Sequence, residues 1–318
     1  FFARIAPALS KKGGETMMTP DEFSLVQANR AKLYRLFGRL FRAPLSQDDI
    51  EALAAARIGS LKSEDAAFDH GMHVMERYLE KRHTGTRAFL GRDFTAAFLG
   101  MRDEAGRYAL PYESAFVDAT QHYMGTARGK VYNIYKKQAL KLAEGIDLPE
   151  DHLAFMCEFM ATLADRAASD MTALRENLLL SQAFLKHHIL NWYPEFSALA
   201  ARLVDERFYR GLLEAAGAFF ALDAKVLRDL VKDEKAKDRS FDLARWELAN
   251  AVPVDKEGVY PQLNRHRCLR VKGMTCDRCT AVCPEAVDPV ANRKHEPQNA
   301  CTACGACVAV CPEKALSL

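Results

Sequence analysis

Eight of the nine cysteines in this 318-residue chain lie at or after Cys268, and the ninth is Cys157. Cysteine thiolates bind metals and iron–sulfur clusters, whereas in an oxidising compartment they form disulfides instead. A single cysteine in the first 260 residues argues against a disulfide framework there, as expected for the reducing cytoplasm. In that compartment a cluster of cysteines indicates metal binding.

The last cysteines form a run of the type C-x2-C-x2-C-x3-C-P, from Cys301 to Pro312. Such a run supplies three thiolates to one iron–sulfur cluster, and its fourth cysteine binds the other cluster in two-cluster ferredoxins. A second run is therefore expected, and CLRVKGMTCDRCTAVCP at 268–284 supplies it. This second run also ends in C-x2-C-x3-C-P, but its first gap holds seven residues where the usual spacing has two.

The two runs together predict two [4Fe-4S] clusters with crossed ligands. If Cys268 does not bind, its cluster keeps three thiolates and is a [3Fe-4S] form. Zinc would favour C-x2-C pairs separated by a longer loop and would not explain two C-x3-C-P endings. Over residues 266–318 the tail resembles bacterial-type dicluster ferredoxins, which implies a small α+β domain. The predicted ligands are Cys268, Cys276, Cys279 and Cys311 for cluster I, and Cys301, Cys304, Cys307 and Cys283 for cluster II.

The long segment before these runs carries a helical apolar period from about residue 20 to residue 235. A first helix ends at Pro44, and Ser46 offers the N-cap of the next one. A later helix is expected to begin at Pro149, with Cys157 in its buried stripe as a small core hydrophobe. We therefore predict an all-α domain. Further helices are expected over 113–144, 167–190, 195–203 and 205–231.

Composition and motifs exclude several other classes of protein. The net charge of +2 gives no reason to expect nucleic acid or an anionic membrane as a partner. No apolar run approaches the roughly 20 residues that cross a bilayer. The sequence has no Gly-rich phosphate loop and no nucleophile elbow. His187 and His188 lie about 100° apart on a helix and cannot chelate one metal, while His70 and His73 are interpreted as exposed polar side chains. No catalytic constellation emerges, so an enzyme is not expected.

Six stretches of the helical segment stand out, in this order: RAKLYRLFGRLFRAPLS (30–46), FTAAFLG (94–100), PYESAFV (111–117), DLPEDHLAFMCEFMATLAD (147–165), FLKHHILNWYPEF (184–196) and FYRGLLEAAGAFFALD (208–223). With these stretches, residues 29 to about 230 resemble the TorD/DmsD/NarJ family of cytoplasmic chaperones for molybdenum-cofactor oxidoreductases. The resemblance implies an all-helical fold. It also implies binding of an apo-enzyme, or of its twin-arginine signal peptide, until the cofactor is loaded.

The family's E-P-x-D-H motif falls on Leu148 to His152, with leucine in place of the first acidic residue. Asp151 and His152 are retained, which implies a similar peptide-binding groove. Asp151 is able to pair with an arginine of a bound peptide, because guanidinium and carboxylate groups form charge-assisted hydrogen bonds. Tyr112, Glu113 and Ser114 are candidates for the same surface. The alternative interpretation is that Asp151 caps the helix and that His152 is a satisfied structural residue.

Four segments follow from these patterns. Residues 1–20 are a disordered N-terminal extension, 21–250 the all-helical chaperone-like domain, 251–265 an extended linker, and 266–318 the ferredoxin domain.

Three hypotheses for the function follow. The favoured one is a cytoplasmic maturation chaperone for a molybdopterin-dependent oxidoreductase, whose clusters supply electrons to the client or report redox state. The second is an electron-transfer protein whose helical domain docks it to a reductase, so that a redox partner protein is expected. The third is an enzyme in its own right. It is disfavoured because eight thiolates on two clusters leave no open iron site.

Overall fold

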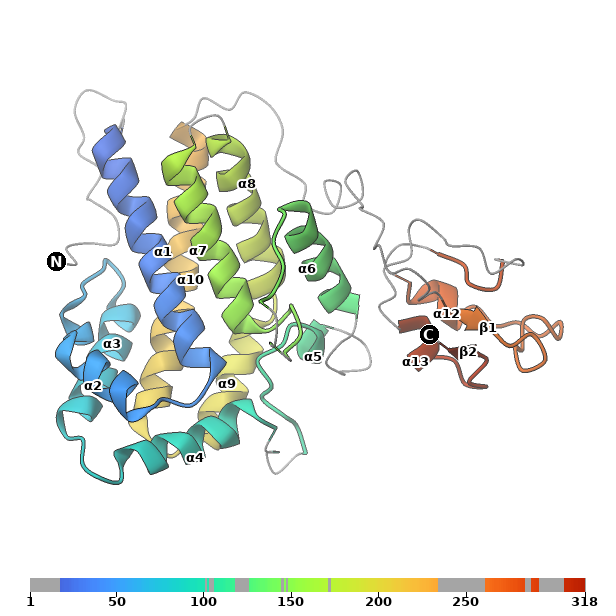
Figure 1. Ribbon diagram of the computed structural model, residues 1–318, viewed down its shortest axis with the longest axis horizontal. Coiled ribbons are helices and arrows are strands. Elements are labelled where there is room, and N and C mark those ends of the chain that lie inside the picture. Colours follow the sequence, from blue (N-terminus) through green and yellow to red (C-terminus); the bar gives the residue numbers. More distant parts are fainter. Residues whose placement is uncertain are drawn as a thin grey trace. The chain divides into compact units, whose positions relative to one another are not determined.

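The computed structural model divides by internal contacts into two compact units (Figure 1). One unit contains the described residues up to Pro111 and those from His152 to Asp233; the other contains Tyr112–Asp151 and the C-terminal region. The described residues are 18–100, 102, 106–117, 126–143, 146, 148–170, 173–233, 261–283, 287–291 and 306–317. Most of the expected N-terminal extension and of the expected linker lies outside them.

The first unit is built from helices that pack lengthwise on one another. Helix α1 (Pro20–Arg42) packs along α7 (Leu153–Ser169), and α3 (Ala66–Glu80) packs along α10 (Arg207–Asp233) (Figure 1). Helix α8 (Leu174–Phe184) contacts both α7 and α10. The all-α prediction for this region is confirmed. Other helices here are α2 (Gln47–Ala55), η1 (Ile58–Ser60), α4 (Thr86–Phe98), the π-helical turn η2 (Leu185–Ile189) and α9 (Tyr193–Leu203).

Two helices of this unit begin at capping boxes. The Thr19 side chain accepts from the Glu22 N–H, while Glu22 accepts from the backbone of Thr19. Ser46 and Asp49 repeat this reciprocal pair at the start of α2, which confirms the prediction that Ser46 is an N-cap. Each pair satisfies two backbone N–H groups that have no partner within the helix.

The core of the first unit is rich in aromatic rings. Phe219 of α10 packs edge-on against Tyr34 of α1, with ring centroids 4.8 Å apart. Cys157 of α7 is fully buried, and burial raises the pKa of its thiol. It is thus a neutral core side chain, which confirms the interpretation of Cys157 as a small hydrophobe rather than a nucleophile.

Helices α3 and α10 cross at two glycines that face each other. A Cβ atom on Gly71 would lie 2.5 Å from the carbonyl oxygen of Gly211, and a Cβ on Gly211 would lie 2.7 Å from the carbonyl oxygen of Gly71. Backbone carbonyls cannot move aside as a flexible side chain does. Glycine at both positions therefore permits this close approach of the two helices.

Two expected helix boundaries are wrong. Helix α7 begins at Leu153 and not at Pro149, because Asp151 is held by a neighbouring segment: its carbonyl oxygen accepts from the Glu113 N–H at 3.1 Å. The helix expected over 167–190 is interrupted after Ser169, where the Asp170 side chain accepts from the Ala173 N–H at 3.3 Å. Over 113–144 the described helices are α5 (Ser114–Val117) and α6 (Thr126–Lys137).

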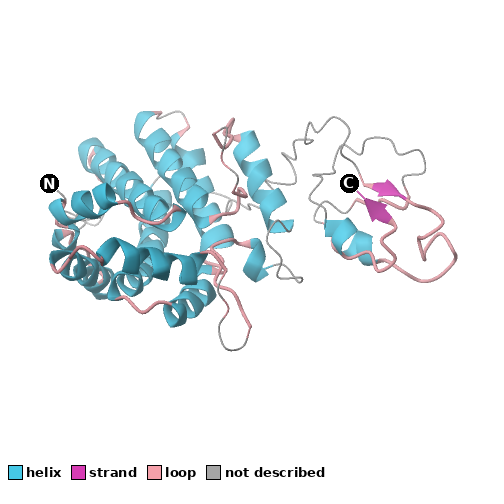
Figure 2. Ribbon diagram, turned by 60° about the horizontal axis from the view of Figure 1, so that its bottom comes forward, coloured by secondary structure: helices cyan, strands magenta, loops and turns pink. Residues whose placement is uncertain are grey.

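The C-terminal region combines very short helices with a two-stranded antiparallel sheet (Figure 2). Strand β1 (Gln262–Leu263) pairs with β2 (Leu316–Ser317), in the register Leu263 opposite Leu316. Gln262 and Leu263 thus form a strand where we expected the end of a linker. The described helices here are α12 (Arg278–Ala281) and α13 (Ala306–Ala309). The expected combination of a helical domain with a small α+β region is confirmed.

Candidate functional site

Four cysteines line one small cavity in the C-terminal region. They are Cys268, Cys276, Cys279 and Cys311, the residues that the crossed spacing assigns to cluster I. Helix α12 carries Cys279, and the strands bring the Cys311 end of the chain beside the Cys268 end. Cys268 and Cys279 are buried together with Leu263 and Leu316. The cavity therefore gathers four soft sulfur ligands with an apolar wall on one side.

Backbone N–H groups point at cysteine sulfurs in both runs. The Ala315 N–H donates to Cys311 Sγ at 3.1 Å, and the Val287 N–H donates to Cys283 Sγ at 3.2 Å. Each donor lies four residues after its cysteine, so the repeated segment C-P-E-x-[AV] produces the same contact twice. Hydrogen bonds of this kind stabilise thiolates and help to set the potential of an iron–sulfur cluster. The repeat is visible in the sequence, although we did not identify this role there.

The seven-residue insertion after Cys268 folds into tight turns. The Lys272 N–H donates to the Cys268 carbonyl at 3.2 Å, and the Met274 N–H donates to the Leu269 carbonyl at 3.0 Å. Gly273 adopts a φ of +83°, a conformation that residues with a Cβ rarely adopt. The insertion is thus compact, and Cys268 lies at the same cavity as Cys276.

The donor set fits an iron–sulfur cluster, because the four candidate ligands at the cavity are all cysteines. Within the described residues, no three His, Cys, Asp or Glu side chains are grouped closely enough to hold one metal ion. Tetrahedral zinc would bring its sulfur ligands to within about 4 Å of each other, given Zn–S bonds of about 2.3 Å. The four thiolates of a cubane each bind a different iron and lie farther apart. Burial raises the pKa of the Cys279 thiol, so metal binding there must displace a proton.

The residues predicted for cluster II are only partly described. Cys283 and Cys307 are half-buried, and Cys307 packs against the small core formed by Leu263, Ala315 and their neighbours. Cys301 and Cys304 lie outside the described residues. Both ligand assignments stay predictions.

The candidate peptide-binding residues form a buried polar cluster. Glu113 and Asp151 are buried, Tyr112 is half-buried, and the Ser114 N–H donates to Asp151 Oδ2 at 2.9 Å. The other carboxylate oxygen of Asp151 is buried and has no hydrogen-bond partner among the described residues. Burial raises the pKa of Asp151 to about 6; Glu113 adds to this rise, while the hydrogen bonds from Ser114 oppose it. A buried carboxylate with a free oxygen is an unusual feature, because such groups are normally satisfied.

His152, and not Asp151, caps helix α7. The ring Nδ1 of His152 accepts from the Ala154 N–H at 3.0 Å. Burial and the nearby Arg42 lower the pKa of His152 to about 3, so the ring is neutral at physiological pH. The alternative that assigned the cap to Asp151 is therefore wrong, whereas the description of His152 as a satisfied structural residue agrees with this bond.

Asp151 and His152 have opposite effects on the pH dependence of stability. Between pH 3.8 and about 6 the folded Asp151 retains a proton that the unfolded chain releases, so stability falls as pH rises through this window. Between about pH 3 and 6.5 the unfolded His152 binds a proton that the folded ring does not, so stability rises with pH.

Asp151→Asn is therefore expected to unmask the histidine effect. The free energy of unfolding of the variant minus that of wild type should rise by about 3 kcal/mol from pH 4 to pH 7. This amount corresponds to a shift of two pKa units. Urea unfolding followed by far-UV circular dichroism at several pH values measures this difference. A pH-independent difference between the two proteins would show that Asp151 ionises normally in the fold.

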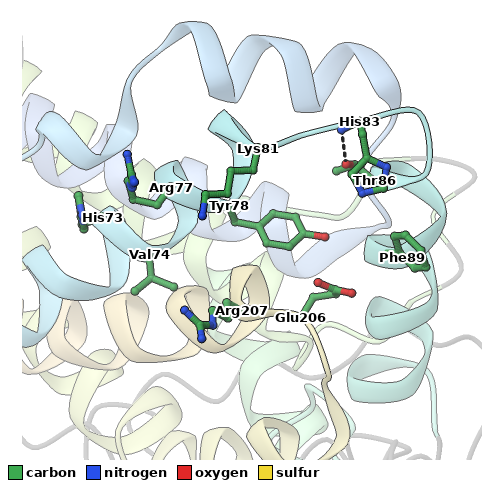
Figure 3. Close-up of a pocket in the computed structure, with 10 residues that line it drawn as sticks. All are labelled: His73, Val74, Arg77, Tyr78, Lys81, His83, Thr86, Phe89, Glu206 and Arg207. Atoms are coloured by element: carbon green, nitrogen blue, oxygen red, sulfur yellow. Dashed lines mark hydrogen bonds between the residues drawn. The ribbon is translucent and has the colours of Figure 1, made fainter.

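A second cavity of about 710 Å³ lies in the helical unit between α3, α4 and the start of α10 (Figure 3). Its lining combines the cations Arg77, Lys81 and Arg207 with one carboxylate, Glu206. Burial and Glu206 raise the pKa of Tyr78, whose ring also lines the cavity. The balance of charge favours anions. Other residues lining it are His73, Val74, His83, Thr86 and Phe89.

The remaining histidines do not form a metal site among the described residues. His70 Nδ1 lies 2.8 Å from Glu214 Oε2, whereas His73 lines the cavity of Figure 3. His188 is buried and the adjacent His187 is exposed, as expected for consecutive positions on a helix. No described helix is both long enough and apolar enough to cross a membrane.

Comparison with known proteins agrees with this arrangement. The family model described as nitrate reductase delta subunit matches residues 62–198, and the model described as 4Fe-4S dicluster domain matches residues 261–312. Chaperone protein TorD of Aeromonas salmonicida is 30% identical over 228 residues, which cover 69% of this chain and 100% of the relative. Chaperone protein TorD of Vibrio cholerae is 26% identical over 225 residues, covering 67% of this chain and 98% of the relative.

These matches assign the chain to a class of protein: a chaperone-family protein with a 4Fe-4S dicluster region. The chain belongs to the TorD family of chaperone proteins and carries a 4Fe-4S dicluster domain at its C-terminal end. Both resemblances found in the sequence are confirmed.

Proposed function

We propose that this protein is a cytoplasmic maturation chaperone for a molybdopterin-dependent oxidoreductase. It binds the apo-enzyme or its twin-arginine signal peptide, and its two [4Fe-4S] clusters supply electrons to the client or report redox state. The observation that carries this proposal is the presence, in one chain, of a TorD-family helical region and a cavity lined by four cysteines. A redox module on a chaperone is useful where the client itself must be loaded with a redox cofactor.

Asp151 supports the peptide-binding part of the proposal. Its carboxylate is fully buried, has one oxygen without a hydrogen-bond partner among the described residues, and has a pKa raised to about 6. An arginine of the client would supply hydrogen bonds and an opposite charge to this destabilised group. Because the carboxylate is buried, the segment that carries Tyr112 and Glu113 has to open for this contact to form.

The cysteines support the redox part. In this proposal cluster I is bound by Cys268, Cys276, Cys279 and Cys311, and cluster II by Cys283, Cys301, Cys304 and Cys307. Each cysteine run thus supplies three ligands to one cluster and its last cysteine to the other. When bound, the clusters supply one-electron chemistry. The protein's own contribution is to hold the thiolates, to donate backbone N–H groups to sulfur, and to keep Cys268 and Cys279 away from water.

The experiment that tests the proposal measures the molybdenum content of the client after maturation with variant chaperones. Cys304→Ser removes a predicted ligand of cluster II, Cys279→Ser removes one of cluster I, and Asp151→Asn removes the proposed arginine partner. The matched control is Thr275→Ser, an exposed position next to Cys276 that supplies no ligand. We expect each of the first three to lower client molybdenum several-fold, and the control to have no effect.

The result also separates this proposal from an electron-transfer protein with a docking scaffold. In that case the cysteine variants would leave the client fully loaded while it loses its reductant. Normal client loading with all three variants would therefore overturn the maturation role. If only the cysteine variants load the client normally, the clusters take no part in the chaperone step.

A further inference from the structure

The seven-residue segment between Cys268 and Cys276 brings Arg270 to the cysteine-lined cavity, where Arg270 pairs with Asp288. Arg270 lies in this insertion and lines the same cavity as Cys268 and Cys279. Its Nη1 lies 2.7 Å from Asp288 Oδ2, with 42% of the Arg270 side chain and 24% of the Asp288 side chain exposed. The pair therefore joins this segment to the residues that follow the C-x3-C-P ending of the same run, Cys283-Pro284.

Asp288 is held firmly in place. Its Oδ1 accepts from the Val290 N–H at 3.0 Å and from the Ala291 N–H at 3.3 Å, while Oδ2 pairs with Arg270. These bonds fix the carboxylate, and the carboxylate in turn fixes the guanidinium. The Asp288 carboxylate raises the pKa of Arg270, and the nearby sulfurs of Cys279 and Cys268 contribute in the same direction. Arg270 therefore lies at the cavity of the four cysteines, as does Arg278 of α12.

We propose that Arg270, held by Asp288 at the cysteine-lined cavity, raises the reduction potential of cluster I. This inference rests on the proposed presence of two clusters. A cluster gains one negative charge when it accepts an electron, so a cation beside it stabilises the reduced form more than the oxidised form. The two runs differ here, because seven residues separate Cys268 from Cys276, whereas only two separate Cys301 from Cys304. The shorter gap has no room for a loop of this kind.

The test measures both reduction potentials by film voltammetry and by EPR-monitored titration of the full, anaerobically prepared chain. Arg270→Gln is expected to disfavour reduction of one cluster about tenfold, a shift of about 59 mV to lower potential for a one-electron couple. Asp288→Asn is expected to shift the same cluster to higher potential, because the arginine charge is no longer neutralised. Arg270→Lys should stay close to wild type.

The matched control is Arg265→Gln, which removes an exposed arginine of the same region that does not line the cavity. Iron and sulfide analysis shows whether each variant retains its clusters. If Arg270→Gln loses them, the potential shift measured for Asp288→Asn tests the inference instead. Opposite shifts at Arg270 and Asp288, confined to one cluster, support the inference. Unchanged potentials, equal shifts of both clusters, or a shift of the same sign in both variants would overturn it. Wild-type protein without two redox couples would instead contradict the proposed cofactor content.

Discussion

Replacing Arg30 with methionine is expected to lower the free energy of unfolding of the helical unit by about 3–5 kcal/mol. Arg30 of α1 and Asp223 of α10 form a bidentate pair with Nε–Oδ1 and Nη2–Oδ2 distances of 2.6 and 3.0 Å. Both side chains are 0% exposed. Burial disfavours the charge on Arg30, yet the Asp223 carboxylate raises its pKa. Removing one partner leaves the other as an isolated buried charge.

The network around the pair allows a matched set of variants. Tyr34 donates to Asp223 Oδ2 at 2.7 Å, so Tyr34→Phe removes one hydrogen bond and should cost only about 1–2 kcal/mol. The double variant Arg30→Met with Asp223→Leu removes both charges and should recover most of the loss. Thermal unfolding followed by circular dichroism should show Arg30→Met melting lower by on the order of 10 °C. A loss below about 1 kcal/mol would mean that water reaches the pair.

Removing iron is expected to unfold the C-terminal region while the helical unit keeps its structure. Among the described residues of this region, the buried ones are Leu263, Cys268, Cys279, Ala315 and Leu316, so two of these five are predicted cluster ligands. Each strand has two residues, and each described helix has four. So small a core does not offset the entropy of ordering the chain, and metal binding must supply folding free energy.

Hydrogen–deuterium exchange of the full chain, with and without iron, measures this dependence. The amides of Ala315 and Val287, which donate to cysteine sulfurs, should lose at least tenfold in protection when iron is removed. Amides of α7 and α10 should be unaffected and serve as the internal control. Equal protection of Ala315 and Leu316 in both states would show that the two strands fold without a metal.

Much of the architecture could be predicted because its signals are local. The segments with a helical apolar period form α1 and α10, as predicted. The Ser46 cap depends only on residues next to it in the sequence. The position of Cys157 in an apolar stripe likewise predicts its burial. In the tail, cysteine spacing alone led to the four residues that line the cavity, since the chemistry of iron–sulfur ligation dictates that spacing.

The start of α7 could not be predicted, because contacts distant in the sequence decide it. Pro149 and the acidic residues after it have the local features of a helix start. Instead, the Asp151 carbonyl oxygen accepts from the Glu113 N–H and the Asp151 carboxylate accepts from the Ser114 N–H, nearly 40 residues earlier. His152 provides the cap. A local propensity of a few tenths of a kcal/mol per residue does not outweigh such contacts.

The sequence by itself therefore determined the class of fold, the family and the cysteine spacing, since these depend on periodicity and on short motifs. Only the tertiary structure decided that Asp151 is buried, that Arg30 pairs with Asp223, and that Arg270 lines the cysteine cavity. The physical reason is the same in each case. Desolvation and charge pairing depend on which side chains, distant in the sequence, are in contact in the fold. A local sequence pattern does not contain that information.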